Sequence, residues 1–385
     1  MKPTSPHRNA ALLSRDECHA LRGLAIIGIF LHNYCHWLGP IVKENEYQFF
    51  RRNTEWLLQV LHAPDQLLPI HLLSFFGHYG VPVFLFLSAY GLTMKYERKP
   101  IAATPPALAD PSIWAFVRFH FLKLFRMMIV GFVAFTMLDA ITPGRHHYHL
   151  LDIVAQMGMF NNLLPTPDRI IWPGPYWFFG LMLQLYVVYR TLLFRKSTAT
   201  TITLMIVCLA IQLLCAPESE ALNRWRYNFV GGMLPFGAGI IYARHGQWLA
   251  SWRDRAGHAC FDALNLLLSA ALVFALSLHY VTWYFVPLFV CSASIALARI
   301  AGGTPWLSFA SRFLVWTGTL SAALFVSHPI TRKIFIPLSR GNDVYAGLLL
   351  YIIASLCVAW LFATLMRKIP NPTLSQPKDH ENQGH

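Results

Sequence analysis

Long apolar stretches separated by short polar segments run along most of the chain. Ten of them approach the roughly twenty residues that an α-helix needs to cross a bilayer. We place these spans near residues 21–39, 72–94, 113–136, 175–194, 201–216, 227–243, 260–279, 281–300, 313–337 and 346–366. A further stretch at 148–164 is typical of an interfacial or re-entrant helix. The pattern predicts an all-α protein, a polytopic transmembrane helical bundle of about ten spans.

Composition and charge agree with a membrane protein. Hydrophobic residues make up 55% of the chain and charged residues 13%, whereas soluble domains carry roughly 25% charged residues. The net charge of +13 does not gather on a soluble module, because the basic residues stand at the ends of apolar stretches. We therefore expect membrane lipids as partners and no nucleic acid. The 7 cysteines are scattered and form no C-x-x-C pair, so neither a disulfide framework nor a zinc site is expected.

The distribution of basic residues predicts the orientation. With the N-terminus inside, about two thirds of the 31 Lys and Arg residues lie on the cytoplasmic side. We therefore expect an integral, multi-pass protein of the plasma (inner) membrane with both termini in the cytoplasm. Residues 1–20 form the N-terminal cytoplasmic segment, 21–368 the membrane domain, and 369–385 a disordered cytoplasmic tail. The first span is expected to be an uncleaved helix rather than a signal peptide.

The first span contains the strongest candidate for chemistry. Arg22 and His32 lie within it, and ionisable residues at membrane depth are a functional-site hypothesis by default. Ten residues along a helix separate them by roughly 15 Å. A buried imidazole can accept a proton from a hydroxyl, and a guanidinium can hold phosphate. His36 lies one turn further on the same face and is a second candidate or a partner. As alternatives, Arg22 is a snorkelling anchor and His32 a packing residue.

Further candidates lie on other spans. Arg118, Lys123 and Arg126 form a basic strip at the start of the third span, suited either to lipid headgroups or to the phosphates of a nucleotide-like donor. Candidate cavity-lining residues are Ser88, Tyr176, Trp177, Gln184 and His328. No P-loop, dinucleotide fingerprint, nucleophile elbow or metal-spaced His/Glu cluster is present. We therefore expect no metal and no bound cofactor.

Several of these segments, taken in order, resemble the membrane-bound acyltransferase-3 family, whose members transfer acetyl or other acyl groups onto sugars and related acceptors. The resemblance extends from Arg15 to about Met366. Its parts are LRGLA at 21–25, GVPVFLFLSAY at 80–90, the basic strip at 118–126, PYWF at 175–178 and SHP at 327–329.

The family signature is an Arg and a His separated by ten residues. Here nine residues separate Arg22 from His32, and Asn33 occupies the usual position. On a straight helix His32 then points about 80° away from Arg22, and His36 about 40° away. A tightened turn near Gly28 would bring His32 closer. We rank His32 ahead of His36 as the base.

The resemblance implies a reaction and its participants. Acyl-CoA, with acetyl-CoA expected, is the cytoplasmic donor, and its phosphates meet Arg118, Lys123 and Arg126. A hydroxyl of an extracytoplasmic carbohydrate or glycan is the acceptor. His32 serves as general base toward that hydroxyl, and Arg22 orients the donor or the base. The sequence thus predicts an O-acetyltransferase-like enzyme that modifies a polysaccharide.

Two other classes of function remain open. A transporter or flippase could use the same Arg and His as a proton or anion path, although no internal repeat of fixed period is evident. A non-catalytic sensor or assembly protein would bind the same ligands without turnover.

Overall fold

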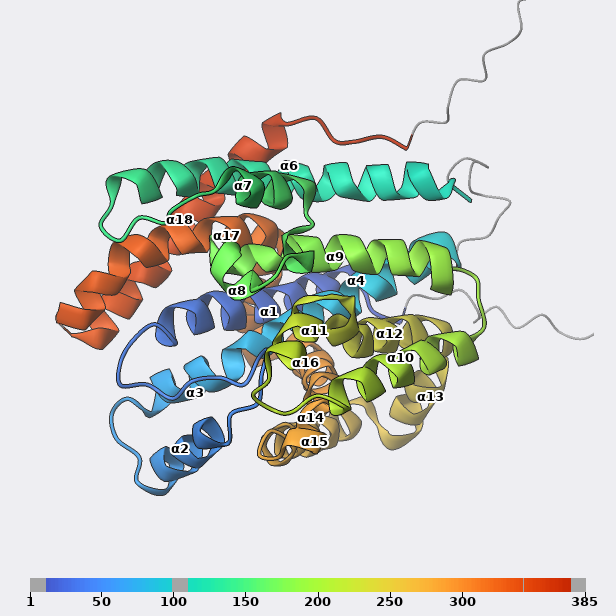
Figure 1. Ribbon diagram of the computed structural model, residues 1–385. Helices are drawn as coiled ribbons and strands as arrows, with labels where there is room; N and C mark the ends of the chain where they lie inside the picture. The colour runs from blue at the N-terminus through green and yellow to red at the C-terminus, as the bar shows by residue number, and fades with distance from the viewer. Residues whose placement is uncertain (1–11, 99–109, 342, 375–385) are drawn as a thin grey trace, which may run out of the picture.

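The chain folds into a bundle of helices. The computed structural model describes residues 12–98, 110–341 and 343–374, and within these ranges it contains no β-strand (Figure 1). The all-α prediction is confirmed. The predicted segments 1–20 and 369–385 lie largely outside the described residues.

The helices follow one another closely along the chain. They are α1 (Arg15–Cys35), α2 (Arg51–His62), α3 (Leu68–Phe76), η2 (Gly77–Tyr79), α4 (Gly80–Tyr96), α6 (Ile113–Ile141), α7 (Leu150–Gly158), η4 (Asn161–Leu163), α8 (Pro167–Ile170), η5 (Gly174–Tyr176), α9 (Trp177–Val188), η6 (Tyr189–Leu193), α10 (Thr198–Leu213), α11 (Glu220–Tyr227), α12 (Phe229–His245), α13 (Gln247–Ala256), α14 (His258–Leu276), α15 (Tyr280–Trp283), α16 (Val286–Gly303), η7 (Pro305–Leu307), α17 (Ser308–Gly341) and α18 (Val344–Lys368).

Every one of the ten predicted stretches is helical, but the count of ten spans is not confirmed. Among the described residues, six helical segments are long and apolar enough to cross a membrane: Leu68–Tyr96, Ile113–Ile141, His258–Leu276, Val286–Gly303, Pro305–Gly341 and Val344–Lys368. The helices α9, α10 and α12 have 12, 16 and 17 residues. In α1, polar side chains such as Arg22 and His32 offset the apolar ones. The stretch at 148–164, predicted to be an interfacial or re-entrant helix, contains the short helix α7.

Polar caps fix where the main helices begin. Ser14 accepts a hydrogen bond from the backbone of Glu17, whose side chain in turn accepts one from the backbone of Ser14. This capping box starts α1 at Arg15, six residues before the predicted span, because it satisfies amide groups that the helix leaves free. Ser112 and Asp343 cap α6 and α18 with one side-chain bond each, in which they accept from the backbone of Ala115 and Ala346.

Helix α1 lies at the centre of the bundle, where it packs against α17, α3, α4 and α16. Two glycines allow the close approach of α1 and α17. A Cβ on Gly23 would lie 2.1 Å from the carbonyl oxygen of Leu314, and one on Gly318 would lie 1.9 Å from that of His19. Any larger residue at either position would push the helices apart. This contact fixes how close α17 lies to α1 and to the polar side chains that α1 carries.

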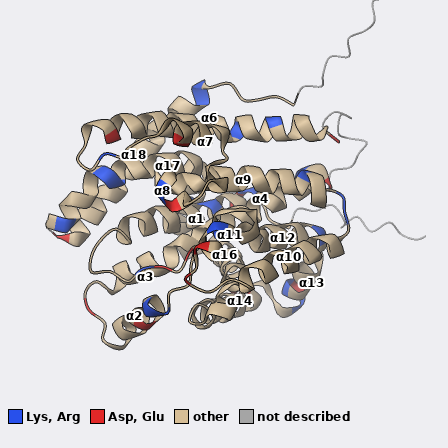
Figure 2. Cartoon of the chain, in the orientation of Figure 1, with Lys and Arg blue, Asp and Glu red and all other residues tan. Residues whose placement is uncertain are grey.

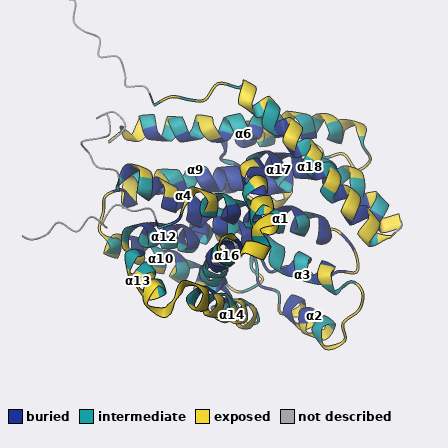
Figure 3. Cartoon of the chain, turned by 180° about the vertical axis from the view of Figure 1, so that it is seen from behind, coloured by how far each residue is buried: buried dark blue, intermediate teal, exposed yellow. Residues whose placement is uncertain are grey.

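The outer helices face away from this core. Figure 3 shows α14 largely exposed, whereas most residues of α1, α4 and α16 are buried or partly buried. Leu264, Leu267 and Leu268 of α14 are among the exposed apolar side chains. The long helices carry few charged residues (Figure 2). An apolar outer surface of this kind suits a lipid environment.

Candidate active site

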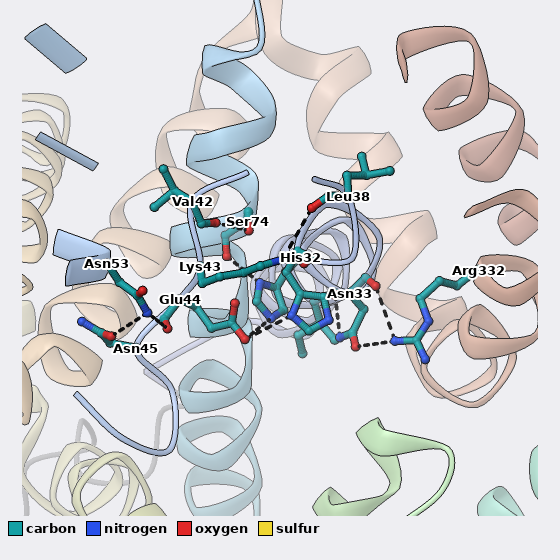
Figure 4. Close-up of polar contacts among 12 residues, drawn as sticks. His32, Asn33, Leu38, Val42, Lys43, Glu44, Asn45, Asn53, Ser74 and Arg332 are labelled. Carbon is teal, nitrogen blue, oxygen red and sulfur yellow. Dashed lines mark hydrogen bonds and ion pairs between the residues drawn. The ribbon is translucent and has the colours of Figure 1, made fainter. Parts of the chain in front are cut away.

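Two histidines lie one turn apart where α1 ends, His32 in its last turn and His36 at its C-cap. Figure 4 shows His32 beside Glu44 and Ser74. His32 is 3% exposed, and its Nδ1 lies 2.7 Å from the carbonyl oxygen of Ser74 on α3. Because a carbonyl oxygen can only accept, Nδ1 carries the proton in this bond. The lone pair of a neutral His32 is therefore on Nε2. The ring of His36 lies beside that of His32, with 4.7 Å between the ring centroids.

Close backbone packing holds His32 in place. Gly77 of η2 lies so near α1 that a Cβ on it would be 2.7 Å from the Cβ of His32 and 2.6 Å from the carbonyl oxygen of Gly28. The turn after α3 thus presses against the helix directly below the imidazole. No side chain larger than hydrogen fits at position 77 without displacing His32.

Glu44 lies in the segment that follows α1, and its carboxylate is close to both histidines. Its Oε1 lies 3.1 Å from Nδ1 of His36 and 4.0 Å from Nε2 of His32. Burial would raise the pKa of Glu44, but the imidazoles of His36 and His32 outweigh burial and hold that pKa below its usual range. Glu44 is therefore a carboxylate, able to stabilise a proton on either ring.

Glu46 lies two residues beyond Glu44 and differs from it in charge. Burial, reinforced by the neighbouring Glu44, raises the pKa of Glu46 to about 8. Arg226 opposes this shift without cancelling it. At neutral pH the two glutamates therefore contribute mainly the single negative charge of Glu44.

These groups face a cavity of about 280 Å³, which we call the histidine cavity. Its polar lining includes His32, Asn33, His36, Glu44, Glu46, His78, Asp168 and Arg332, and its aromatic lining includes Tyr47, Trp172, Trp177, Phe178 and Tyr227. A concave site with a few converging polar groups on an aromatic wall is the usual form of a small-molecule site.

Arg332 brings a positive charge to the histidine cavity from α17. The residue is 6% exposed, and Nη1 donates to Oδ1 of Asn33 at 3.3 Å. Its guanidinium also lies 5.1 Å from the ring centre of Trp37. No carboxylate of the described residues forms an ion pair with it. A buried guanidinium without a carboxylate partner is costly, so an anion in the cavity would find a preorganised partner.

A second cavity of about 590 Å³, which we call the basic cavity, lies toward the other end of α1. Its basic lining residues are Arg22, Lys95, Lys123, Arg126 and Arg367, and no Asp or Glu of the described residues lines it. Ser88 and Tyr186 add hydroxyl groups. Phe178 lines both cavities. The two spaces therefore approach each other at one phenyl ring.

The structure separates residues that the sequence analysis grouped together. His32, His36 and Trp177 line the histidine cavity, whereas Arg22, Ser88, Lys123 and Arg126 line the basic cavity. Helix α1 is regular, and no tightened turn brings His32 beside Arg22. Arg22 therefore lies with the basic residues of the second cavity and not beside His32.

Four predicted site residues line neither cavity. Arg118 is exposed, because five residues along a helix turn it about 140° away from Lys123. Tyr176 is fully buried and donates to the carbonyl oxygen of Val326.

Gln184 and His328 form hydrogen bonds away from both cavities. Gln184 donates to Asn228 at 2.8 Å and accepts from the backbone of Phe229 at 3.0 Å, so it ties α9 to α12. His328 is fully buried, and its Nδ1 lies 3.1 Å from the carbonyl oxygen of Leu324 one turn earlier.

The sequence analysis missed Glu44, Glu46 and Arg332. The two glutamates stand in the short sequence KENE at 43–46, where charged residues after a span look like an ordinary loop. Arg332 lies inside a predicted span and carried the same signal as Arg22, an ionisable residue at membrane depth.

The comparisons with known proteins agree with this architecture. The profile of the acyltransferase-3 family, described as an acyltransferase domain, matches residues 16–364. No curated protein and no solved structure matches the chain. The matched region includes the whole histidine cavity, the basic cavity apart from Met366 and Arg367, and nearly every described helix. The chain therefore belongs to the acyltransferase-3 family of membrane acyltransferases.

Proposed function

We propose that this protein transfers an acyl group, with acetyl as the expected one, from cytoplasmic acyl-CoA to a hydroxyl of an extracytoplasmic carbohydrate or glycan. The proposal rests on one observation: a basic cavity and a histidine cavity approach each other at Phe178. Acyl transfer between substrates on opposite sides of a membrane needs such an arrangement. The family match supports the acyltransferase part of the proposal.

The donor is expected in the basic cavity. Acyl-CoA carries several phosphate charges, and Arg22, Lys123 and Arg126 present cationic groups to the same space. Arginine binds phosphate through paired, charge-assisted hydrogen bonds, and lysine as a point charge. With the phosphates held there, the thioester would extend toward Phe178.

The acceptor hydroxyl is expected in the histidine cavity, where His32 acts as general base. Nε2 takes the hydroxyl proton, the oxygen attacks the thioester carbonyl carbon, and the C–S bond then breaks to release CoA thiolate. Ser74 keeps the proton on Nδ1 throughout, and Glu44 stabilises the imidazolium that forms. Arg332 lies in the same cavity and would stabilise negative charge on the carbonyl oxygen.

The test is a comparison of surface glycans. Mass spectrometry of glycans from cells with and without this protein should show O-acyl groups that depend on it. Purified protein in nanodiscs, supplied with acetyl-CoA and the isolated glycan, should release CoA thiol in proportion to acylation. Unchanged glycans together with no thiol release would refute the proposal.

A further inference from the structure

His32, His36 and Glu44 are arranged as metal ligands are. One ligand atom from each residue lies within 4.8 Å of the other two. In a tetrahedral zinc site, bonds of roughly 2.0–2.2 Å place neighbouring ligand atoms about 3.4 Å apart. The distances from Oε1 of Glu44, 3.1 Å to His36 and 4.0 Å to His32, lie on either side of that value. Small side-chain movements would complete the geometry.

His32 and Glu44 offer lone pairs to the centre of the cluster, and His36 joins them once Nδ1, which donates to Oε1 of Glu44, exchanges its proton for a metal. The bond from His32 Nδ1 to the carbonyl oxygen of Ser74 leaves the lone pair on Nε2, which faces the carboxylate. Two acceptors facing each other repel unless a cation lies between them. A backbone carbonyl that fixes the tautomer of a histidine is also the usual support behind a metal ligand.

Two buried polar atoms of the cluster are also free to bind a ligand. Oε2 of Glu44 and Nε2 of His36 are buried, and neither finds a hydrogen-bond partner among the described residues. His32 and His36 are spaced i, i+4 on α1, so both rings project from one face of a rigid helix. The sequence alone did not show this set, because Glu44 reaches it through the fold of the segment after α1.

We infer that His32, His36 and Glu44 form a binding site for a divalent transition-metal ion, with Zn²⁺ as the best match. Two imidazoles and one carboxylate are ligands that zinc accepts, and the histidine cavity leaves a fourth position open. The inference has a regulatory consequence that rests on the proposed function. A metal on Nε2 of His32 occupies the lone pair that the base needs, so Zn²⁺ inhibits acyl transfer.

Binding can be measured with the metal alone. The full-length protein in nanodiscs is stripped with a chelator and titrated with Zn²⁺ against a chromophoric competitor. We expect one tight site per chain, and Glu44→Gln or His36→Gln should weaken it by more than about 100-fold, since even supporting residues change metal affinity by 10- to 100-fold. His147→Gln removes an exposed histidine outside the cluster and should bind as the wild type does.

Several results would overturn the site. Absence of tight binding by the wild-type protein is sufficient, and so is equal affinity in wild type and both cluster variants. Thermal unfolding without Zn²⁺ checks that each variant is folded. Because the His36 side chain is 23% exposed, His36→Gln keeps the test decisive even if Glu44→Gln does not fold.

A second measurement tests the inhibition. Zn²⁺ should reduce acyl transfer at the concentration that half-fills the site, and chelator should restore the activity. Activity that instead requires Zn²⁺ after stripping would overturn both the inhibitory role and the assignment of His32 as base. Since the titration uses no acyl-CoA and no acceptor, the binding result is independent of whether the acyltransferase proposal holds.

Discussion

Replacement of His32 is the most direct test of the proposed chemistry. A positioned general base contributes about 100- to 10,000-fold in rate, or about 3–5 kcal/mol of activation free energy. His32→Gln retains a side-chain amide that can donate to the carbonyl oxygen of Ser74, so that buried acceptor stays satisfied. We therefore expect a folded protein whose acylation rate falls by at least about 100-fold.

His36→Gln provides the matched comparison on the next turn of α1. This change removes the contact with Glu44 but leaves Nε2 of His32 and its support from Ser74. We expect a loss of about tenfold or less, or about 1.4 kcal/mol.

The assay is mass spectrometry of O-acyl groups on surface glycans, normalised to the amount of protein in the membrane. Full activity of His32→Gln would refute the mechanism. An inactive His36→Gln with an active His32→Gln would move the base to His36.

Three further changes test the surroundings of this base. Arg126→Gln should weaken acyl-CoA binding to the membrane-inserted protein by about tenfold or more, as expected on loss of a charge-assisted bond, whereas Arg118→Gln on the exposed face should not. Unchanged acyl-CoA affinity in Arg126→Gln would identify Arg126 as a lipid anchor. Arg332→Gln should lower kcat by about 100-fold with little change in the KM for acyl-CoA, as removal of an oxyanion donor does; a change confined to KM would place Arg332 in ground-state binding. Gly77→Ala should reduce both activity and thermal stability, because its methyl group would collide with His32; an unaffected variant would show that the turn can move away.

Periodicity and composition predict most of the fold, and long-range contacts determine the rest. Every apolar stretch became a helix because its hydrogen bonds are local and its length follows from hydropathy. The residue at which a helix begins is less predictable. The capping box at Ser14 and Glu17, for example, starts α1 at Arg15, before the predicted span. The sequence indicated His32 and His36 because their spacing along one helix is visible in it. Glu44 completes the cluster from a loop, and no periodicity places a loop side chain.

The basic strip shows the same limit. Lys123 and Arg126 lie on one face of α6, while Arg118 turns away from them. Charge alone grouped the three residues, and helical geometry separates them. Arg22 and His32 likewise share a helix but belong to different cavities. Their separation along the axis, about 15 Å, was the sequence signal that they need not act on the same atom.

The position of Phe178 between the two cavities has an electrical consequence. The hydrocarbon core of a bilayer normally insulates over about 30 Å. If the two cavities open to opposite sides of the membrane, as the proposed function requires, water in them narrows that insulating layer to the aromatic ring and its immediate neighbours. The membrane voltage then falls steeply there. Moving one elementary charge across the full membrane potential changes its free energy by about 2.3 kcal/mol per 100 mV. Any step that carries charge past Phe178 is therefore driven or opposed by the membrane potential as well as by substrate concentration.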